Sequence, residues 1–161
     1  MKIALAGGSG FLGRPLRAEL AARGHQVVVL KRGGDNLPVW GADANGAEAV
    51  INLAGAGIAD KRWTAARKHE LRQSRILTTR ALVGAITRAT PRPAVFISGS
   101  AIGYYGDSGD AAVDETSAPG SDFLATLCVD WEAEANTAAA LGCRVAIVRT
   151  GVVLARDGGA L

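Results

Sequence analysis

Short apolar runs alternate with longer stretches of helical spacing along this chain. Runs of this kind predict five strands, at residues 2–6, 26–30, 49–53, 94–97 and 144–148. Their Val- and Ile-rich composition is typical of strands buried on both faces of a parallel sheet. The one other candidate strand, residues 37–40, contains Pro38, which restricts it to a sheet edge.

The stretches between these runs predict three helices. The first starts near Phe11 and ends before Gly24, and we expect a distorted first turn because Pro15 lacks an N–H group. The others cover residues 60–88 and 121–141. Basic residues of the second helix predict a solvated face or, alternatively, contact with an anionic ligand or a partner subunit. Its predicted buried stripe is Leu77, Ala81, Leu82, Ala85 and Ile86.

Strands that alternate with helices predict an α/β fold. The expected architecture is a Rossmann-type, doubly wound parallel sheet with helices on both faces. The 161 residues fit one domain that is large enough to bury a core. With 48% hydrophobic and 20% charged residues, the composition is that of a globular protein.

Composition also narrows the choice of partners. The net charge of +3 is too small to predict nucleic-acid binding. Cys128 and Cys143 follow no disulfide or metal-site pattern, so we expect no metal and a reducing compartment. The sequence shows no signal-peptide pattern and no apolar run approaching about 18 residues. We therefore expect a soluble, cytoplasmic protein with no membrane segment.

Glycines mark the bend between the first strand and the first helix. Bare backbone lets a diphosphate approach closely, and a helix N-terminus offers it unpaired N–H groups and a partial positive charge. Because the pattern lies between a strand and a helix, it predicts a dinucleotide site, although a turn that serves only close packing is the alternative. The predicted site comprises Gly7, Gly8, Ser9, Gly10, Phe11, Leu12 and Gly13.

The residues after the second and third predicted strands bear on the choice of cofactor. A site for NAD(H) usually has Asp or Glu after the second strand, whereas Lys31 and Arg32 stand here. A guanidinium binds a phosphate through two parallel hydrogen bonds, so these cations favour NADP(H) over NAD(H), unless they form only a solvated turn. After the third strand, small residues let the chain pass under the cofactor at Asn52, Leu53, Ala54 and Gly55.

Several motifs together resemble a known family. Residues 6–13, Ala-Gly-Gly-Ser-Gly-Phe-Leu-Gly, look like the opening of the extended short-chain dehydrogenase/reductases, the nucleotide-sugar epimerase and dehydratase group. More narrowly, the chain resembles the atypical subfamily 39U, whose members are labelled predicted epimerases or cell-division inhibitors of the SulA type. The segments that carry this resemblance are residues 51–55, 58–64, 74–76, 79–80, 100–106, 122–125 and 131–132.

The resemblance implies a substrate site and an assembly. Ser100 matches the catalytic hydroxyl of the family, and it follows the fourth predicted strand, at the edge where ligands bind in such sheets. The implied substrate is a nucleotide sugar or another carbonyl or alcohol compound, and the implied homodimer forms through residues 64–88 and 121–141. The family continues with roughly as much chain again. Residues 1–161 would then be the NADP(H)-binding domain, a fragment or a natural truncation without the C-terminal substrate domain.

One departure from the wider superfamily affects the chemistry. Its enzymes have a Tyr-x-x-x-Lys pair, in which the tyrosine exchanges a proton with the substrate and the lysine lowers the tyrosine pKa. Counting back from Glu132, which matches a glutamate of the same helix, puts this pair at Leu124 and Cys128. Leucine has no proton to exchange, and a cysteine in an apolar helix supplies no cation.

Tyr104 and Tyr105 are the candidates to replace the missing acid. A tyrosine ordinarily has a pKa of about 10, so either one needs a nearby cation to act as a base at neutral pH. Lys61 and Lys68 are the only lysines in the middle of the chain. Two functions remain open: an NADP(H)-dependent oxidoreductase or epimerase/dehydratase-like enzyme, and a non-catalytic NADP(H)-binding sensor or regulatory protein.

Overall fold

The computed structural model describes residues 1–30, 44–155 and 158–159. Five parallel strands form one sheet in the order β2-β1-β3-β4-β5. An antiparallel pair, β6 and β7, follows the sheet. The strands are β1 (Lys2–Ala6), β2 (Gln26–Leu30), β3 (Ala49–Asn52), β4 (Val95–Ala101), β5 (Arg144–Thr150), β6 (Leu154–Ala155) and β7 (Gly158–Gly159). The candidate strand at residues 37–40 lies outside the described residues.

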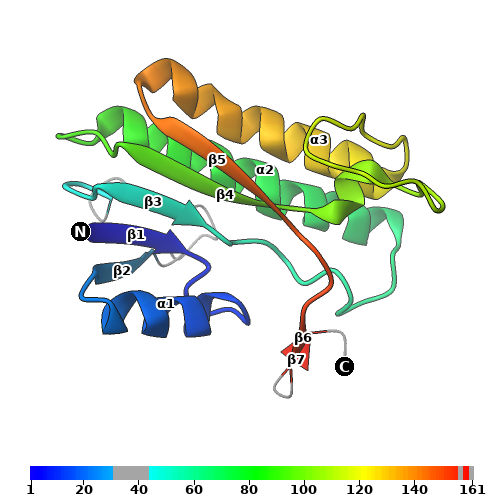
Figure 1. Cartoon of the computed structure of the whole chain (residues 1–161), viewed down its shortest axis with the longest axis horizontal. Coiled ribbons are helices and arrows are strands. Elements are labelled where there is room, and N and C mark those ends of the chain that lie inside the picture. Colours follow the sequence, from blue (N-terminus) through cyan, green and yellow to red (C-terminus); the bar gives the residue numbers. More distant parts are fainter. Residues whose placement is uncertain (31–43, 156–157, 160–161) are drawn as a thin grey trace.

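Helices lie on both faces of the sheet, as the predicted Rossmann-type architecture requires. In Figure 1, α2 and α3 run along one face, and α1 lies on the other side beside β1 and β2. None of the helices in the described ranges is long and apolar enough to cross a bilayer. The helices are α1 (Gly13–Ala22), α2 (Ala65–Arg88) and α3 (Phe123–Asn136), with short 3-10 helices η1 (Ile102–Tyr105) and η2 (Thr137–Leu141).

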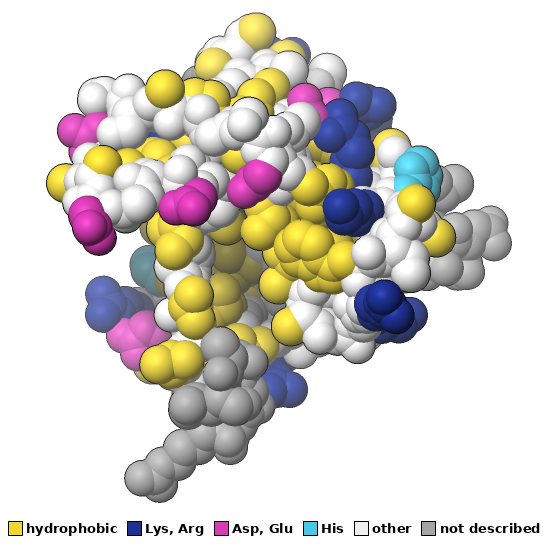
Figure 2. Space-filling view, turned by 90° about the vertical axis from the view of Figure 1, so that its right-hand side faces the viewer, with side chains coloured by type: hydrophobic (Ala, Val, Ile, Leu, Met, Phe, Trp, Pro, Cys, Tyr) yellow, Lys and Arg dark blue, Asp and Glu magenta, His cyan; other side chains and the backbone are white. Residues whose placement is uncertain are grey.

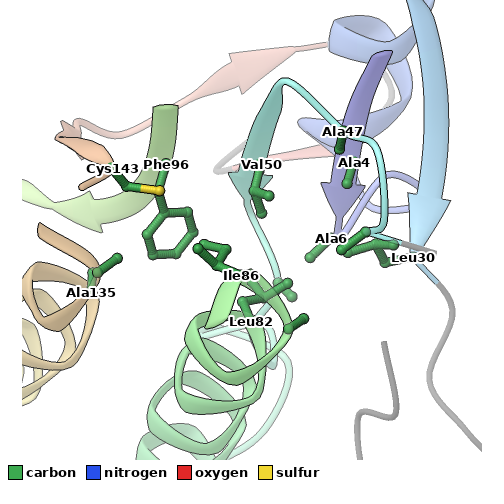
Figure 3. Packing of buried hydrophobic residues seen from close by; sticks show 14 residues of the cluster. Ala4, Ala6, Leu30, Ala47, Val50, Leu82, Ile86, Phe96, Ala135 and Cys143 are labelled. Atoms are coloured by element: carbon green, nitrogen blue, oxygen red, sulfur yellow. The ribbon is translucent and has the colours of Figure 1, made fainter. Parts of the chain in front are cut away.

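Two apolar clusters fill the space between the sheet and its helices. Successive side chains of a strand point to opposite faces, so Ala4 and Ala6 face α2 whereas Ile3 and Leu5 face α1. Figure 3 shows the larger cluster, in which Phe96 of β4 lies close to Ile86 of α2. Phe96 is fully buried, which contributes about 2–3 kcal/mol to folding.

The structure does not show the distorted first turn of α1 that the sequence predicted. The N–H groups on either side of Pro15 each donate to the carbonyl four residues back, at 3.0 and 3.3 Å. Pro15 has no N–H group to make the bond between them. α1 begins at Gly13, two residues after the predicted start, so Pro15 lies in its first turn, where the N–H groups of a helix have no intrahelical partner in any case.

The structure corrects several predicted boundaries. β4 and β5 run to Ala101 and Thr150, further than predicted, because the small and polar residues at their ends stay paired in the parallel ladder. In α2, Leu77 is not part of the buried stripe, since it is 39% exposed. The valines of β2 are only half-buried, because β2 lies at the end of the described sheet.

Candidate functional site

The bend after β1 has no room for side chains at two of its glycines. A Cβ on Gly7, where φ is +80°, would lie 2.6 Å from the carbonyl carbon of Leu53. A Cβ on Gly13 would lie 2.0 Å from the carbonyl oxygen of Gly7. Real Cβ atoms do not come this close to backbone. The chain segments therefore meet here backbone to backbone, which is how a turn that cradles a diphosphate is built.

The N-terminus of α1 is open toward this bend. Leu12 is the N-cap, no side chain accepts a hydrogen bond there in the described structure, and the first turn has no acidic residue. Ser9 and Gly10 are exposed, so the loop is accessible. Unpaired N–H groups at a helix start bind an anion such as a dinucleotide diphosphate. Lys31 and Arg32, expected to hold the 2′-phosphate, lie outside the described residues.

Asn52 fixes the second segment of the predicted cofactor site. Its side chain is fully buried, its Nδ2 donates to Thr79 Oγ1 at 2.9 Å, and its Oδ1 accepts from the Ala54 N–H at 3.2 Å. Trp131 Nε1 donates to the same Thr79 oxygen at 2.9 Å. Asn52 therefore shapes the bend, while Leu53 donates its N–H to Ala6 O at 2.9 Å and so holds the bend beside β1.

Two arginines of α2 support the continuation of this segment. Arg75 donates to Ala56 O at 3.2 Å, and a Cβ on Gly55 would lie 3.1 Å from its Cζ. Burial lowers the pKa of the Arg75 guanidinium. Arg67 is only 5% exposed, donates to Gly57 O, and pairs with Glu70 at 2.7 Å and with Asp60 at 3.8 Å. The predicted solvated face is therefore wrong for these two arginines, which bind loop carbonyls.

Ser100 is joined to a partly buried ion pair. Its Oγ donates to Glu132 Oε1 at 2.5 Å, and both residues are less than 9% exposed. Glu132 also accepts two hydrogen bonds from Arg149, Nε to Oε1 and Nη2 to Oε2, each at 2.9 Å. This fork-to-fork geometry is the strongest arrangement of a guanidinium with a carboxylate. The hydrogen bond from Arg149 to Glu132 raises the pKa of Arg149, so the guanidinium stays charged.

The same arginine holds both tyrosines. Its Nη1 donates to the Tyr105 hydroxyl oxygen at 2.9 Å, and its Cζ lies 3.4 Å from the centre of the Tyr104 ring. The two rings meet edge to face, with centroids 5.3 Å apart. The structure thus brings together the three predicted catalytic residues, Ser100, Tyr104 and Tyr105, around Arg149.

The cation beside the tyrosines is one that the sequence analysis did not assign. It considered Lys61 and Lys68, but Lys68 lies over the ring of Phe123, 5.2 Å from its centre. Arg149 lies opposite Ser100 in the ladder between β4 and β5. The sequence offered one indication of Arg149. Neighbouring parallel strands place their carboxyl ends at one edge of the sheet, so a residue at the end of the fifth predicted strand could be expected near Ser100.

Figure 2 shows this edge of the molecule from the right of Figure 1. Hydrophobic side chains gather at the centre of the face, with acidic side chains along its upper rim and basic side chains on its right. Ligands of open α/β sheets bind outside the carboxyl ends of the strands. The glycine bend and the Ser100 cluster both lie at this edge, since they follow or end parallel strands of one sheet.

Comparison with known proteins identifies the family of the chain. A family model described as "NAD dependent epimerase/dehydratase family" matches residues 3–158. The chain belongs to this family. A curated relative, the epimerase family protein MT2273 of Mycobacterium tuberculosis, is 41% identical over 170 residues, which cover 99% of this chain and 56% of the relative. The chain thus spans about half the length of the curated relatives it matches.

Two solved structures of family members are also similar. The crystal structure of human epimerase family protein SDR39U1 (isoform 2) with NADPH has a TM-score of 0.87 and 35% identity, covering 99% of this chain and 57% of that chain. The nucleoside-diphosphate sugar epimerase from Corynebacterium glutamicum has a TM-score of 0.83 and 36% identity, covering 100% of this chain and 36% of that chain. The predicted resemblance to subfamily 39U is confirmed.

Two residues of α3, Leu124 and Cys128, stand at the positions that the sequence assigns to the Tyr-x-x-x-Lys pair of the wider superfamily. Cys128 is buried beside Ser100 and the backbone of Ala101, and burial raises the pKa of its thiol. Leu124 lies against Gly103, where a Cβ would approach Leu124 Cβ to 3.3 Å. Both side chains lie beside the end of β4 or η1, and neither is a tyrosine or a lysine that could exchange a proton or supply a cation.

Proposed function

We propose that this chain is the cofactor-binding part of an NADP(H)-dependent oxidoreductase or nucleotide-sugar epimerase/dehydratase-like enzyme. The main support for this proposal is the glycine bend. Its backbone contacts leave no space for a Cβ at Gly7 or Gly13, and it lies beside the N-terminus of α1, where no side chain of the described residues caps the helix. A dinucleotide bound there supplies a nicotinamide that accepts or donates a hydride at a carbonyl or alcohol carbon. The NADPH in the human relative supports the same site.

Each candidate residue has a proposed task. The bend from Gly7 to Gly13 binds the diphosphate, and Lys31 with Arg32 binds the 2′-phosphate that distinguishes NADP(H) from NAD(H). Residues 52–55 pass beneath the cofactor. Ser100 orients a substrate oxygen, and its lone pairs are available because its proton is donated to Glu132. Tyr104 or Tyr105 exchanges the proton.

Cofactor choice is tested by calorimetric titration of the protein with NADPH and NADH. We expect NADPH to bind at least about tenfold more tightly, since a bidentate phosphate contact contributes roughly 1.5–3 kcal/mol. Arg32→Ser should remove this preference. Arg23→Ser is the matched control, because Arg23 is an exposed arginine paired with Glu19 near the end of α1. Equal binding of both dinucleotides by the unmodified protein would contradict the assignment.

A second candidate function is a cofactor sensor without turnover. The observation that favours it is that Leu124 and Cys128 of α3 stand at the positions expected for the acid and the cation, beside η1 and the end of β4. One experiment separates the two functions. The NADPH-bound protein is incubated with UDP-sugars or simple ketones, and oxidation of NADPH is followed by the nicotinamide absorbance. Thermal stabilisation by NADPH without any oxidation favours the sensor, and oxidation that depends on Ser100 favours the enzyme.

A further inference from the structure

Arg149 connects the acidic residue of α3 to the tyrosines of η1. We infer that Arg149, fixed by Glu132, is the positioning cation for Tyr105, and that Tyr105 rather than Tyr104 exchanges the proton with the substrate oxygen. This inference rests on the proposed function and deepens it. The superfamily places its cation on the helix that corresponds to α3, at the position of Cys128, whereas here the cation reaches the phenol from β5.

The direction of the hydrogen bond singles out Tyr105. Arg149 Nη1 is the donor, at 2.9 Å, so the phenol oxygen accepts and the phenol proton is free for another acceptor. Tyr104 contacts the guanidinium through the face of its ring, with Cζ 3.4 Å from the ring centre. A ring face stabilises the cation, but it does not direct a proton of the hydroxyl group.

Glu132 keeps the guanidinium in place. Its two oxygens bind the Nε and Nη2 edge of Arg149, each at 2.9 Å, which leaves Nη1 directed to Tyr105. The remaining contact of Nη1 is the carbonyl oxygen of Glu115 at 3.5 Å. Glu132 is 8% exposed and also accepts the Ser100 hydroxyl at 2.5 Å. One carboxylate thus orients both the group that binds the substrate oxygen and the cation that faces the phenol.

In the proposed proton transfer, every bond that forms is matched by one that breaks. When a carbonyl substrate is reduced, the O–H bond of Tyr105 breaks as a new O–H bond forms on the substrate oxygen. The matching hydride comes from the reduced dinucleotide of the proposed function. The phenolate that remains accepts a charge-assisted hydrogen bond from Arg149 Nη1, which lies 2.9 Å from the phenol oxygen. In the oxidative direction, Tyr105 takes the same proton back.

Tyrosine nitration tests the inference without a substrate. Tetranitromethane reacts with the phenolate form, and Tyr104 and Tyr105 are the two tyrosines of this sequence. Both are partly buried, so Tyr104 is an internal reference of similar exposure. We expect the initial rate at mildly alkaline pH, mapped by peptide mass spectrometry, to be higher at Tyr105 than at Tyr104. In Arg149→Gln, the rate ratio of Tyr105 to Tyr104 should fall about tenfold.

The variants separate positioning from simple structural support. If Arg149 only attaches η1 to β5, Arg149→Gln exposes both tyrosines and both rates rise together, which overturns the inference. An unchanged ratio also overturns it. Arg149→Lys keeps a positive charge but loses the two-pronged guanidinium geometry, so its ratio should lie between those of the unmodified protein and Arg149→Gln. If Arg149→Gln does not fold, the comparison of Arg149→Lys with the unmodified protein replaces it. Arg144→Gln, an exposed arginine at the start of β5, should leave the ratio unchanged.

Cofactor binding is measured separately on the same proteins. Arg149→Gln and Tyr105→Phe should bind NADPH within about twofold of the unmodified protein, since neither residue contacts the glycine bend. If the unmodified protein binds no dinucleotide, the proposed function fails whatever the nitration ratio shows. If NADPH binds but the ratio does not depend on Arg149, only the positioning inference fails.

Discussion

Replacing Gly13 with alanine tests how tightly the first turn of α1 packs against the bend after β1. Gly13 is the first residue of α1, so alanine there gains at most the roughly 0.5–1 kcal/mol by which it is favoured over glycine inside a helix. At this position the added Cβ would lie 2.0 Å from Gly7 O and 2.7 Å from Gly8 Cα. These are backbone atoms, so they cannot rotate away as the end of a side chain does.

The clash should outweigh the helix propensity. Overpacking a tight contact costs about 1–3 kcal/mol, and a contact this short lies at the upper end of that range. The net loss of unfolding free energy should be about 2 kcal/mol. For a domain of this size, that corresponds to a fall in Tm of about 4–8 °C. Because α1 must move to relieve the clash, its N–H groups lose their alignment and NADPH affinity should fall at least about tenfold.

Differential scanning calorimetry and NADPH titration measure the two effects. Gly151→Ala is the control, since a Cβ there meets nothing within 4 Å. It should change the unfolding free energy by less than about 0.5 kcal/mol. A Gly13→Ala protein with a raised Tm and unchanged NADPH affinity would show that helix propensity dominates and that the bend is not close-packed.

Three further predictions concern other parts of the chain. Arg67→Met should lower the unfolding free energy in urea by about 1–3 kcal/mol, because it removes hydrogen bonds of a buried guanidinium, whereas exposed Arg62→Met should not. Burial raises the pKa of the Cys128 and Cys143 thiols, so the folded protein keeps these protons where the unfolded chain loses them. The unfolding free energy should therefore fall as pH rises above about 8.5. This fall should be smaller in the double variant Cys128→Ala/Cys143→Ala. If α2 and α3 form a homodimer contact, Leu77→Asp, at a position 39% exposed, should give a monomer by light scattering with NADPH binding intact; a monomeric unmodified protein would contradict this.

The sequence predicted most of the fold because local patterns determine it. The apolar runs at β1 and β3 and the glycines between β1 and α1 have few other structural interpretations. Strand ends were harder to predict. Ser100 looked like the start of a loop, but its pairing opposite Arg149 keeps it in the ladder. Pairing between strands that are distant in the sequence is a long-range property, and no single run of residues specifies it.

The candidate site was predicted only in part, for a related reason. The three catalytic candidates share one short segment, so the sequence identified them together. Glu132 and Arg149 come from an adjacent helix and strand, and their hydrogen bonds depend on the register of β4 with β5. Arg67 and Arg75 looked like part of a solvated basic face because their carbonyl partners lie in a loop without a sequence pattern.

The hydroxyl of Thr79 links the two halves of the site. It accepts one hydrogen bond from Asn52 at the bend after β3 and another from Trp131 on α3. A mutation that shifts α3 should therefore also disturb the bend after β3, because Trp131 and Asn52 share this hydroxyl group. Substitutions on α3 and at Asn52 should therefore not act independently on stability, because both change the hydrogen bonds that meet at Thr79.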